Sequence, residues 1–489
     1  MRKVIDLQME FWKKDIANIE FDLQSRDEIP KLLMGLQFIY RTAVIREKVF
    51  KILKQIVPKQ SHETGRPGMD LWKILVLGTL RLNCNWDFDK VHEMANNHHQ
   101  LRQMLGHNET DFDSNYALQT IRDNIALLSP PILDEINQVV VKTGQRIISP
   151  NKEPQLRGSC DSFVVETDVH YPTDTNLLFD AMRKMISLIA IICSEVGITA
   201  WRQSHHNIIK VKRLLRSIQK LRRSTSKDEA KKQIRDQLII AENQNYVDVC
   251  QDFVLRVKET IRILGELGIL SMGQQVRLIC IEEYIRHAER QIDQIQRRVV
   301  LDEKIPHDEK VFSIFEPHTE WISKGKAGVP QELGLSVCVL KDQYGFILHH
   351  QVMEQQTDSQ VAVAMAQGAK DRFENLTSCS FDKGFYSPEN KGQLANILDY
   401  VVLPKKGRLS AKDKQIEHSE EFVESRRKYS AVESSINALE NHGLDRCLDH
   451  GLHGFKRYTA LAVLARNIQL LGHLLQQKEL KRQKRRKAA

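Results

Sequence analysis

The sequence predicts an α/β protein: a mixed β-sheet with flanking helices, preceded by a helical N-terminal domain and interrupted after its first strand by an all-helical insertion. Three observations lead to this prediction. Apolar residues recur at helical spacing through the first 150 residues, short β-branched runs alternate with helices after residue 305, and a long helical stretch separates the first strand from the later ones. We therefore expect a helical domain at 1–150, an α/β domain at 151–174 and 305–470, a helical insertion at 175–304 and a basic tail at 471–489.

Helical periodicity in the N-terminal region is clearest at 70–82 and 116–128, and Pro67–Gly68 and Pro130–Pro131 interrupt the pattern. Short helices joined by polar turns are typical of a helix-turn-helix that binds DNA, and equally of a bundle that forms a dimer. Both roles remain open for this domain.

The first predicted strand is GSCDSFVVETDV at 158–169, which is rich in β-branched residues. The helical insertion that follows contains a basic stretch at 210–235, with eleven basic and two acidic residues. Such a density fits a surface that follows a phosphate backbone, with Arg222 and Arg223 as candidate contacts, or an ordinary solvated helix face.

The rest of the chain alternates between strands and helices. Strands are expected at 310–317, 332–340, 344–353, 376–384 and 399–404. Helices are expected at about 357–374, from 387 onward, at 430–443 and at 457–475. The final twelve residues, KELKRQKRRKAA, predict a disordered basic tail that contacts phosphate groups nonspecifically.

Composition narrows the class of protein. Apolar residues make up 41% and charged residues 28% of the 489, which excludes a chain disordered throughout, and the net charge of +9 favours a polyanionic partner. The eight cysteines form no C-x-x-C pair, so we expect neither a zinc knuckle nor a disulfide framework. No signal-peptide pattern or membrane-length apolar run is present, which predicts a cytoplasmic protein.

Three acids are candidates for a shared site. Asp161 lies inside an apolar strand, where an ionised carboxylate is costly unless it binds a cation or a partner, and Asp382 ends a later strand. Glu433 opens a helix beside its apolar stripe, and Glu440, two turns later, is an alternative on nearly the same face. Carboxylates suit Mg²⁺, and two such ions can clamp the oxygens of an in-line phosphoryl displacement. Most acids in a protein are, however, solvated or paired.

Five segments stand in order along the chain: GRPGMDLWKILVLGTLRLN at 65–83 and the segments at 161–178, 315–326, 381–390 and 430–467. Together they resemble the motif blocks of DDE insertion-sequence transposases of the ISNCY type. The resemblance implies an RNase H-like catalytic domain that cleaves DNA at terminal inverted repeats and transfers the strand to target DNA. It also implies two Mg²⁺ ions, with Mn²⁺ as a substitute.

The same resemblance assigns roles to the three acids. Asp161 matches the first acid in the family's D-[ST]-x-V-[VI] strand, Asp382 the second in its D-[KR]-G-[FY] strand, and Glu433 the glutamate of its V-E helix. All three are expected to be catalytic and to bind the metal.

The helix that carries Glu433 departs from a signature of related transposases, Y-x-x-R-x-x-x-E-x-x-x-x-x-x-K. The tyrosine position holds Arg426, the arginine position Tyr429 and the lysine position Glu440. The DNA contacts near this helix therefore stay open, as does the choice between Glu433 and Glu440.

Further basic residues are candidate DNA contacts. Lys383 follows Asp382, and Lys456 and Arg457 follow the glutamate helix, although charge balance or surface solvation would also explain them. His170 is a candidate phosphate contact or a hydrogen-bonded structural residue.

We therefore expect a transposase that acts on double-stranded DNA, both element ends and target, as a homodimer or larger assembly in the bacterial nucleoid, without a membrane partner. The alternatives are a metal-dependent nuclease without strand transfer and a domesticated DNA-binding repressor.

Overall fold

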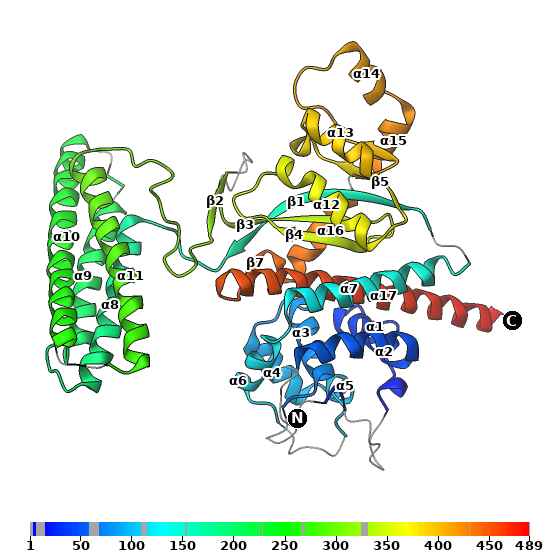
Figure 1. Cartoon of the computed structure of the whole chain (residues 1–489), viewed down its shortest axis with the longest axis horizontal. Coiled ribbons are helices and arrows are strands. Elements are labelled where there is room, and N and C mark those ends of the chain that lie inside the picture. Colours follow the sequence, from blue (N-terminus) through cyan, green and yellow to red (C-terminus); the bar gives the residue numbers. More distant parts are fainter. Residues whose placement is uncertain are drawn as a thin grey trace. The chain divides into compact units, whose positions relative to one another are not determined.

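The computed structural model describes residues 3–5, 15–57, 68–108, 115–151, 154–223, 225–226, 228–266, 268, 270–323, 331–429 and 431–488. The chain forms two compact units (Figure 1). The sheet unit comprises Met1–Asp168 and Glu320–Ala489, and the helical unit comprises Val169–Thr319. None of the described helices combines the length and apolar character needed to cross a bilayer.

The sheet unit is built on a mixed sheet, as the sequence predicts. Its strands are β1 (Leu156–Thr167), β2 (Glu320–Ser323), β3 (Gln331–Lys341), β4 (Ile347–Val352), β5 (Leu376–Phe381), β6 (Tyr400–Val402) and β7 (Arg446–Cys447). The order β2-β3-β1-β5-β6 places β1 in the centre, antiparallel to β3 and parallel to β5, and β6 continues the parallel side. β4 pairs with β3, and β7 pairs with the end of β1.

Helices cover both faces of this sheet because its strands are apolar on both faces (Figure 1). Helix α12 (Asp358–Arg372) connects β4 to β5, and α13 (Pro388–Ile397) connects β5 to β6. On β1, Cys160 belongs to the core that contains α12, whereas Phe163 and Val165 belong to the core on the other face. Alternating side chains of one strand thus join two cores.

The N-terminal helices pack against the second face, together with the C-terminal helix. They are α1 (Glu28–Arg41), α2 (Ala43–Leu53), α3 (Leu71–Asn83), α4 (Phe88–Asn97), α5 (His99–Met104), α6 (Leu118–Ile125), α7 (Pro130–Ile148) and α17 (Gly451–Ala488), with short 3₁₀ turns η1 (Ile16–Asn18) and η2 (Lys54–Ile56). Helices α1 and α17 approach so closely that a Cβ on Gly472 would lie 1.8 Å from the carbonyl oxygen of Lys31. These helices and the sheet share one apolar core.

Between β6 and α17 the chain forms short helices. They are α14 (Ala411–Glu417), α15 (Glu420–Tyr429), α16 (Ala431–Leu439) and the π-helical turn η5 (Glu440–Leu444). Within this turn Gly443 has a φ of +98°, which lies in the left-handed region that favours glycine. A 3₁₀ turn, η4 (Lys383–Phe385), follows β5.

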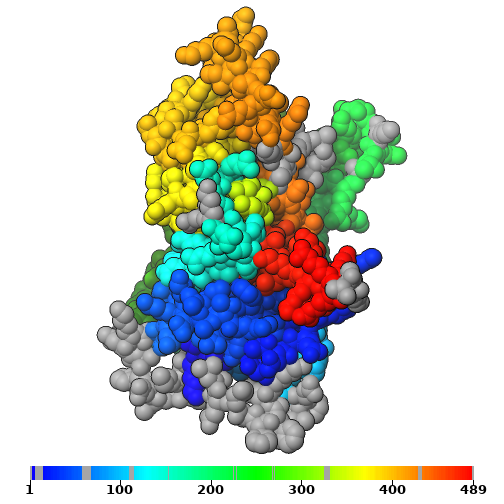
Figure 2. All heavy atoms as spheres, turned by 90° about the vertical axis from the view of Figure 1, so that its right-hand side faces the viewer, coloured from blue at the N-terminus to red at the C-terminus, as the bar shows by residue number. Residues whose placement is uncertain are grey.

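The predicted disordered tail is wrong, because α17 continues as a helix to Ala488. Lysine, arginine, glutamine and glutamate favour helix, and the first half of α17 is buried and already helical, so the basic end extends an existing helix. Figure 2 shows this end of the chain, in red, at the surface.

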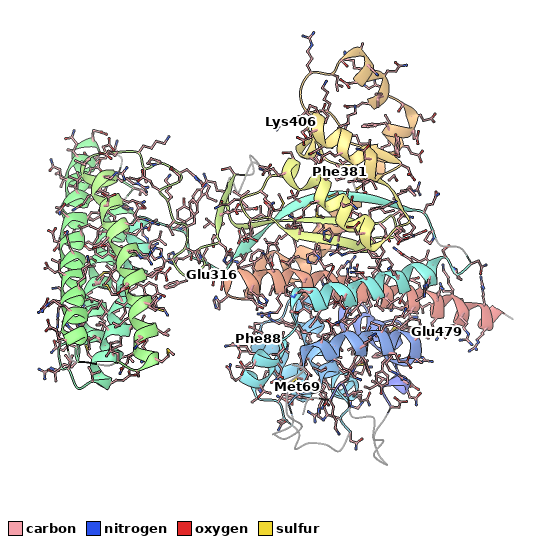
Figure 3. All side chains as sticks on the ribbon, in the orientation of Figure 1. Met69, Phe88, Glu316, Phe381, Lys406 and Glu479 are labelled. Carbon is pink, nitrogen blue, oxygen red and sulfur yellow. The ribbon has the colours of Figure 1, made fainter. Side chains whose placement is uncertain are left out.

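A buried ion cluster joins α3 to α17. The Arg81 guanidinium lies 2.8 Å from Asp449 Oδ1, and Arg457 lies 2.7 Å from Asp449 Oδ2. Arg81 also stacks on Phe88, labelled in Figure 3, with its Cζ atom 3.9 Å from the ring centre. The side chains of Arg81, Asp449 and Arg457 are only 1%, 6% and 14% exposed. One carboxylate thus neutralises two buried cations.

Two buried asparagines bind the backbone of the edge strand β4. Asn467 of α17 accepts the backbone N–H of Ile347 at 3.0 Å and donates to the carbonyl of the same residue at 2.9 Å. Asn137 of α7 donates to that carbonyl at 3.1 Å and accepts from Asn467 at 2.7 Å. Both polar groups of Ile347 are therefore bonded to side chains.

In the described residues of the helical unit, four helices surround a core of their own: α8 (Asp174–Glu195), α9 (Ser204–Arg222), α10 (Glu229–Glu266) and α11 (Met272–Ile295), the last followed by the π-helical turn η3 (Gln296–Val300). The predicted strand at 310–317 is wrong, since this segment forms no strand. Its Ile314 is buried in the helical core, and the ring of Phe315 contacts Tyr284. The apolar residues that suggested a strand instead pack against helices from an irregular segment.

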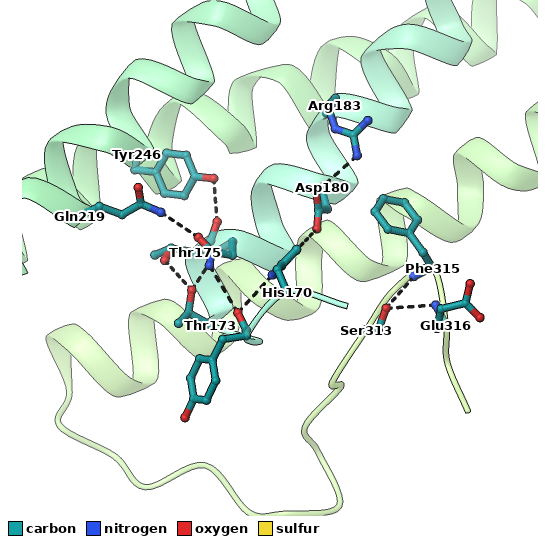
Figure 4. A network of polar contacts seen from close by, with 12 residues as sticks. His170, Thr173, Thr175, Asp180, Arg183, Gln219, Tyr246, Ser313, Phe315 and Glu316 are labelled. Atoms are coloured by element: carbon teal, nitrogen blue, oxygen red, sulfur yellow. Dashed lines mark hydrogen bonds and ion pairs between the residues drawn. The ribbon is translucent and has the colours of Figure 1, made fainter. Parts of the chain in front are cut away.

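His170, a candidate phosphate contact, has a structural partner near the start of the helical unit. Its Nε2 lies 2.5 Å from Asp180 Oδ2, and Asp180 is also 3.5 Å from Arg183 (Figure 4). The hydrogen bond that His170 donates to Asp180 raises the pKa of His170, against the opposing effect of burial. This geometry fits the structural alternative.

We expect the His170–Asp180 pair to stabilise the helical unit at acidic pH. Because the pKa of His170 is raised in the folded protein, the stabilisation is fully present below the unfolded pKa of about 6.5 and is lost as the pH rises through the folded pKa. An NMR titration should place the His170 midpoint above 6.5, and Asp180→Asn should lower it. An unchanged midpoint in Asp180→Asn would contradict this assignment.

Candidate functional site

A gap in the sheet lies beside the middle of β1. Pairing with β5 ends at Cys160, opposite Phe381, and pairing with β7 begins at Glu166, opposite Arg446. β3 occupies the other edge of β1 along this whole stretch. In the described part of the chain, no strand pairs with β1 on the β5 side between Cys160 and Glu166. This stretch of β1 instead forms one wall of a pocket.

The pocket has a volume of about 610 Å³ and is lined by carboxylates from three parts of the chain. The acidic residues are Asp161 of β1, Asp358 of α12, Glu433 of α16 and Glu440 of η5. Hydroxyl and amide side chains add to the lining: Ser162, Ser336, Gln356, Thr357 and Asn437. Among the described residues that line the pocket, none is a lysine, arginine or histidine.

Asp161 is half-buried on β1, directly opposite Val339 of β3. Its Oδ1 accepts the backbone N–H of Ser162 at 2.8 Å. Burial raises the pKa of the neighbouring Cys160 thiol and of Cys379, so both stay protonated at neutral pH. The strand therefore presents a carboxylate beside a neutral, apolar sheet interior.

The structure brings Glu433 and Glu440 to the same pocket as Asp161. Buried Val432 and Leu439 anchor α16, and the two glutamates, seven residues apart, lie about two helical turns from each other on one side. Neither their position in the pocket nor their spacing in the sequence therefore decides which of the two glutamates is the third acid of the site.

Asp358 is a pocket residue that sequence reasoning missed. Its Oδ1 accepts a hydrogen bond from Ser162 Oγ at 2.6 Å. A Cβ placed on Gly384 would lie 2.8 Å from Asp358 Oδ2, so this carboxylate also touches the turn after β5. In the sequence, Thr357 and Gln360 form the capping box of α12, and Asp358 follows the N-cap Thr357. An acid in the first turn of a helix is common and gives no sign of a functional site.

Asp382 lies next to the pocket and is not among the residues that line it. Cys160 of β1 and Phe381 of β5 are paired on neighbouring parallel strands. Asp161 and Asp382 are the residues that directly follow this pair, one on each chain segment. Such strands run about 4.8 Å apart. Asp382 is exposed, and Lys383 after it is exposed as well at the start of η4.

The pocket's donors are carboxylate, hydroxyl and amide oxygens, which is the ligand chemistry of a hard divalent cation. Across the described residues, however, no three acidic, cysteine or histidine side chains converge closely enough to hold one metal ion. The donor chemistry fits a divalent cation, and the side chains as placed do not form a complete set of ligands.

The other predicted DNA contacts are not among the described residues that line the pocket. Lys456 forms an ion pair with Glu354, with Nζ 2.5 Å from Oε1, and Arg457 is held by the buried Asp449. In the helical unit, Arg222 and Arg223 are exposed at the C-terminal end of α9.

No protein-family model, no curated protein and no solved structure matches this chain.

Proposed function

We propose that this chain is a DDE transposase: a metal-dependent enzyme that cleaves DNA at terminal inverted repeats and joins the freed end to target DNA. The observation that carries the proposal is the carboxylate-lined pocket at the gap beside β1. Asp161 and Glu433, two acids that the motif resemblance singles out, lie 272 residues apart in sequence and line the same pocket.

The architecture supports an RNase H-like catalytic domain with a helical insertion after its first strand. The central strand β1 has an antiparallel neighbour on one side and a parallel neighbour on the other, and the parallel strand β5 ends beside the middle of β1, next to Asp161. The helical unit separates β1 from β2 along the chain, which is the place proposed for the insertion.

Asp161, Asp382 and Glu433 are the residues that would hold divalent metal, Mg²⁺ or Mn²⁺, with Glu440 as the alternative third ligand. When bound, the metal would supply charge neutralisation at the phosphate and an activated water. None of the described lining residues is basic, which favours a bound cation, since the acids would otherwise repel one another.

The chain's own contribution is positioning. The open edge of β1 leaves room for a phosphodiester beside Asp161, and the exposed Lys383 lies next to Asp382, where an ammonium group can hold a phosphate oxygen. The proposed partners are double-stranded DNA, as element ends and as target, and a second copy of the chain on that DNA. The proposed location is the bacterial cytoplasm, on the nucleoid.

The proposal is tested with a supercoiled plasmid that carries the DNA flanking the gene on both sides. The protein is incubated with this plasmid, a second target plasmid and Mg²⁺, with EDTA as the control. Cleavage at the flank boundaries and joined products support a transposase. Cleavage without joining would indicate a nuclease instead, and DNA binding without metal-dependent cleavage would indicate a repressor.

Asp358 gives a further prediction at the same pocket. Asp358→Asn is expected to reduce metal-dependent cleavage about 10–100-fold, because the carboxylate that binds Ser162 and touches the Gly384 turn loses its charge. Asp371→Asn, on the same helix and outside the pocket, is the matched control. Equal cleavage by the two variants would remove Asp358 from the site.

A further inference from the structure

The C-terminal end of α17 extends beyond the part of the helix that packs in the core. Residues up to Leu471 are mostly buried, whereas 481–486 are exposed. Figure 2 shows this end at the surface, and Figure 3 labels Glu479 on it. The side chains of this segment are therefore available to a partner.

Five cations of this segment form a basic stripe, which consists of Lys478, Lys481, Arg482, Arg485 and Arg486. Together they line a shallow surface hollow of about 410 Å³. Their spacing of i, i+3, i+4, i+7 and i+8 places them on one side of the helix. A disordered tail would spread these charges, whereas the helix concentrates them on a single face.

Little in the described structure neutralises the basic stripe. Arg482 has a distant acidic partner, with Nη1 3.7 Å from Glu479 Oε2, and Lys478 donates to the backbone carbonyl of Ile147 at 2.6 Å. Within the described residues, no ion pair is formed by Lys481, Arg485 or Arg486. At least three adjacent cations are thus left for an external anion.

We propose that the basic stripe binds the sugar–phosphate backbone of duplex DNA independently of base sequence, as a contact separate from the carboxylate pocket. This inference rests on the proposed function for its choice of DNA. The stripe spans eight helical steps, about 12 Å. That length covers about three phosphates of one strand at an axial spacing of about 3.4 Å.

The composition of this helix end favours nucleic acid over a membrane surface. A helix that lies in a bilayer interface carries a broad apolar face opposite its cations. Here the residues between the cations are Glu479, Leu480, Gln483 and Lys484, and Leu480 is the one apolar side chain among them. The stripe offers charge without an apolar anchor.

The basic stripe lies at a fixed distance along α17 from Lys456. Lys456, which pairs with Glu354 just before the pocket residue Gln356, is on the same continuous helix as Lys478. The two lysines are 22 residues apart, or roughly 33 Å along the helix. This spacing between Lys456 and the start of the basic stripe is close to the length of one turn of duplex DNA.

The test compares variants in the intact chain, in EDTA, by fluorescence anisotropy with a labelled 30-base-pair duplex of arbitrary sequence. The triple variant K481Q/R485Q/R486Q is expected to bind at least 10-fold more weakly near 0.1 M salt, and the slope of log K against log salt should fall by about 3. Glutamine keeps helix propensity, and circular dichroism checks the fold.

Two controls separate charge on this face from other effects. K481R/R485K/R486K keeps the charge and should bind like the parent, and K484Q removes one charge from another side of the same helix and should weaken binding less than R485Q. Parent-like affinity and slope in the triple variant would overturn the proposal. So would a triple variant that loses binding to anionic phosphatidylglycerol vesicles while it still binds the duplex like the parent.

The failure of this inference is distinguishable from the failure of the proposed function. Binding is measured without metal, so D161N should retain stripe-dependent affinity. If the plasmid assay shows no cleavage while the triple variant still loses affinity for DNA, the basic stripe is supported as a DNA contact and the transposase proposal is contradicted.

Discussion

Asp161→Asn and Glu433→Gln are each expected to reduce Mg²⁺-dependent cleavage of the flank-containing plasmid by about 10³-fold or more, equivalent to about 4 kcal/mol in the activation barrier. Both side chains line the pocket, and each substitution removes a negative oxygen ligand while keeping the side chain's size. Binding to the same DNA should stay measurable in a shift assay. Asp382→Asn is expected to behave in the same way.

Two matched variants make this measurement specific. Glu166→Gln changes an acid on the same strand that pairs with Arg446 at 2.9 Å and lies outside the pocket, so it should cleave like the parent. Glu440→Gln tests the alternative third ligand. Full cleavage by Glu433→Gln together with loss of cleavage in Glu440→Gln would make Glu440 the third ligand. Full cleavage by Asp161→Asn would show that this pocket is not the catalytic site.

Asp449→Ala is expected to lower the free energy of unfolding by about 3–5 kcal/mol, because it leaves the guanidinium groups of Arg81 and Arg457 buried without their carboxylate. Thermal and denaturant unfolding of the parent and the variant would measure the loss. Glu479→Ala is the control, since it removes a partly exposed acid whose ion pair is 3.7 Å long and should cost about 0–1 kcal/mol.

A loss below about 1 kcal/mol in Asp449→Ala would show that the cluster contributes little to folding. The result also decides how Arg457 is interpreted. If the cluster is as important as its burial indicates, substitutions of Arg457 will weaken DNA binding through loss of folded protein, and they cannot be taken as evidence for direct contact.

The sequence predicted the sheet well where its signals were local. The first strand, the hairpin of β3 and β4 and the helices after them follow from apolar alternation and turn residues. The errors have physical causes. Ile314 and Phe315 are apolar because they pack on helices, and the basic tail is helical because it continues a buried helix.

The site could be predicted only in part. Asp161 stands out as a charge inside an apolar strand, and Glu433 as a neighbour of a buried stripe. The pocket also depends on where β5 stops and β7 starts along β1, which is a long-range property that no local pattern encodes. Asp358 joins the pocket through this tertiary arrangement, so its sequence context gave no functional signal.

The hydrogen bonds that Asn467 and Asn137 form with the backbone of Ile347 affect how the protein behaves at high concentration. An edge strand normally presents unsatisfied N–H and C=O groups that recruit a strand from another molecule, which is a common route to aggregation. At Ile347 both groups are already occupied by Asn467 and Asn137. The side chains of α7 and α17 thereby imitate a neighbouring strand at this position and block intermolecular growth of the sheet there.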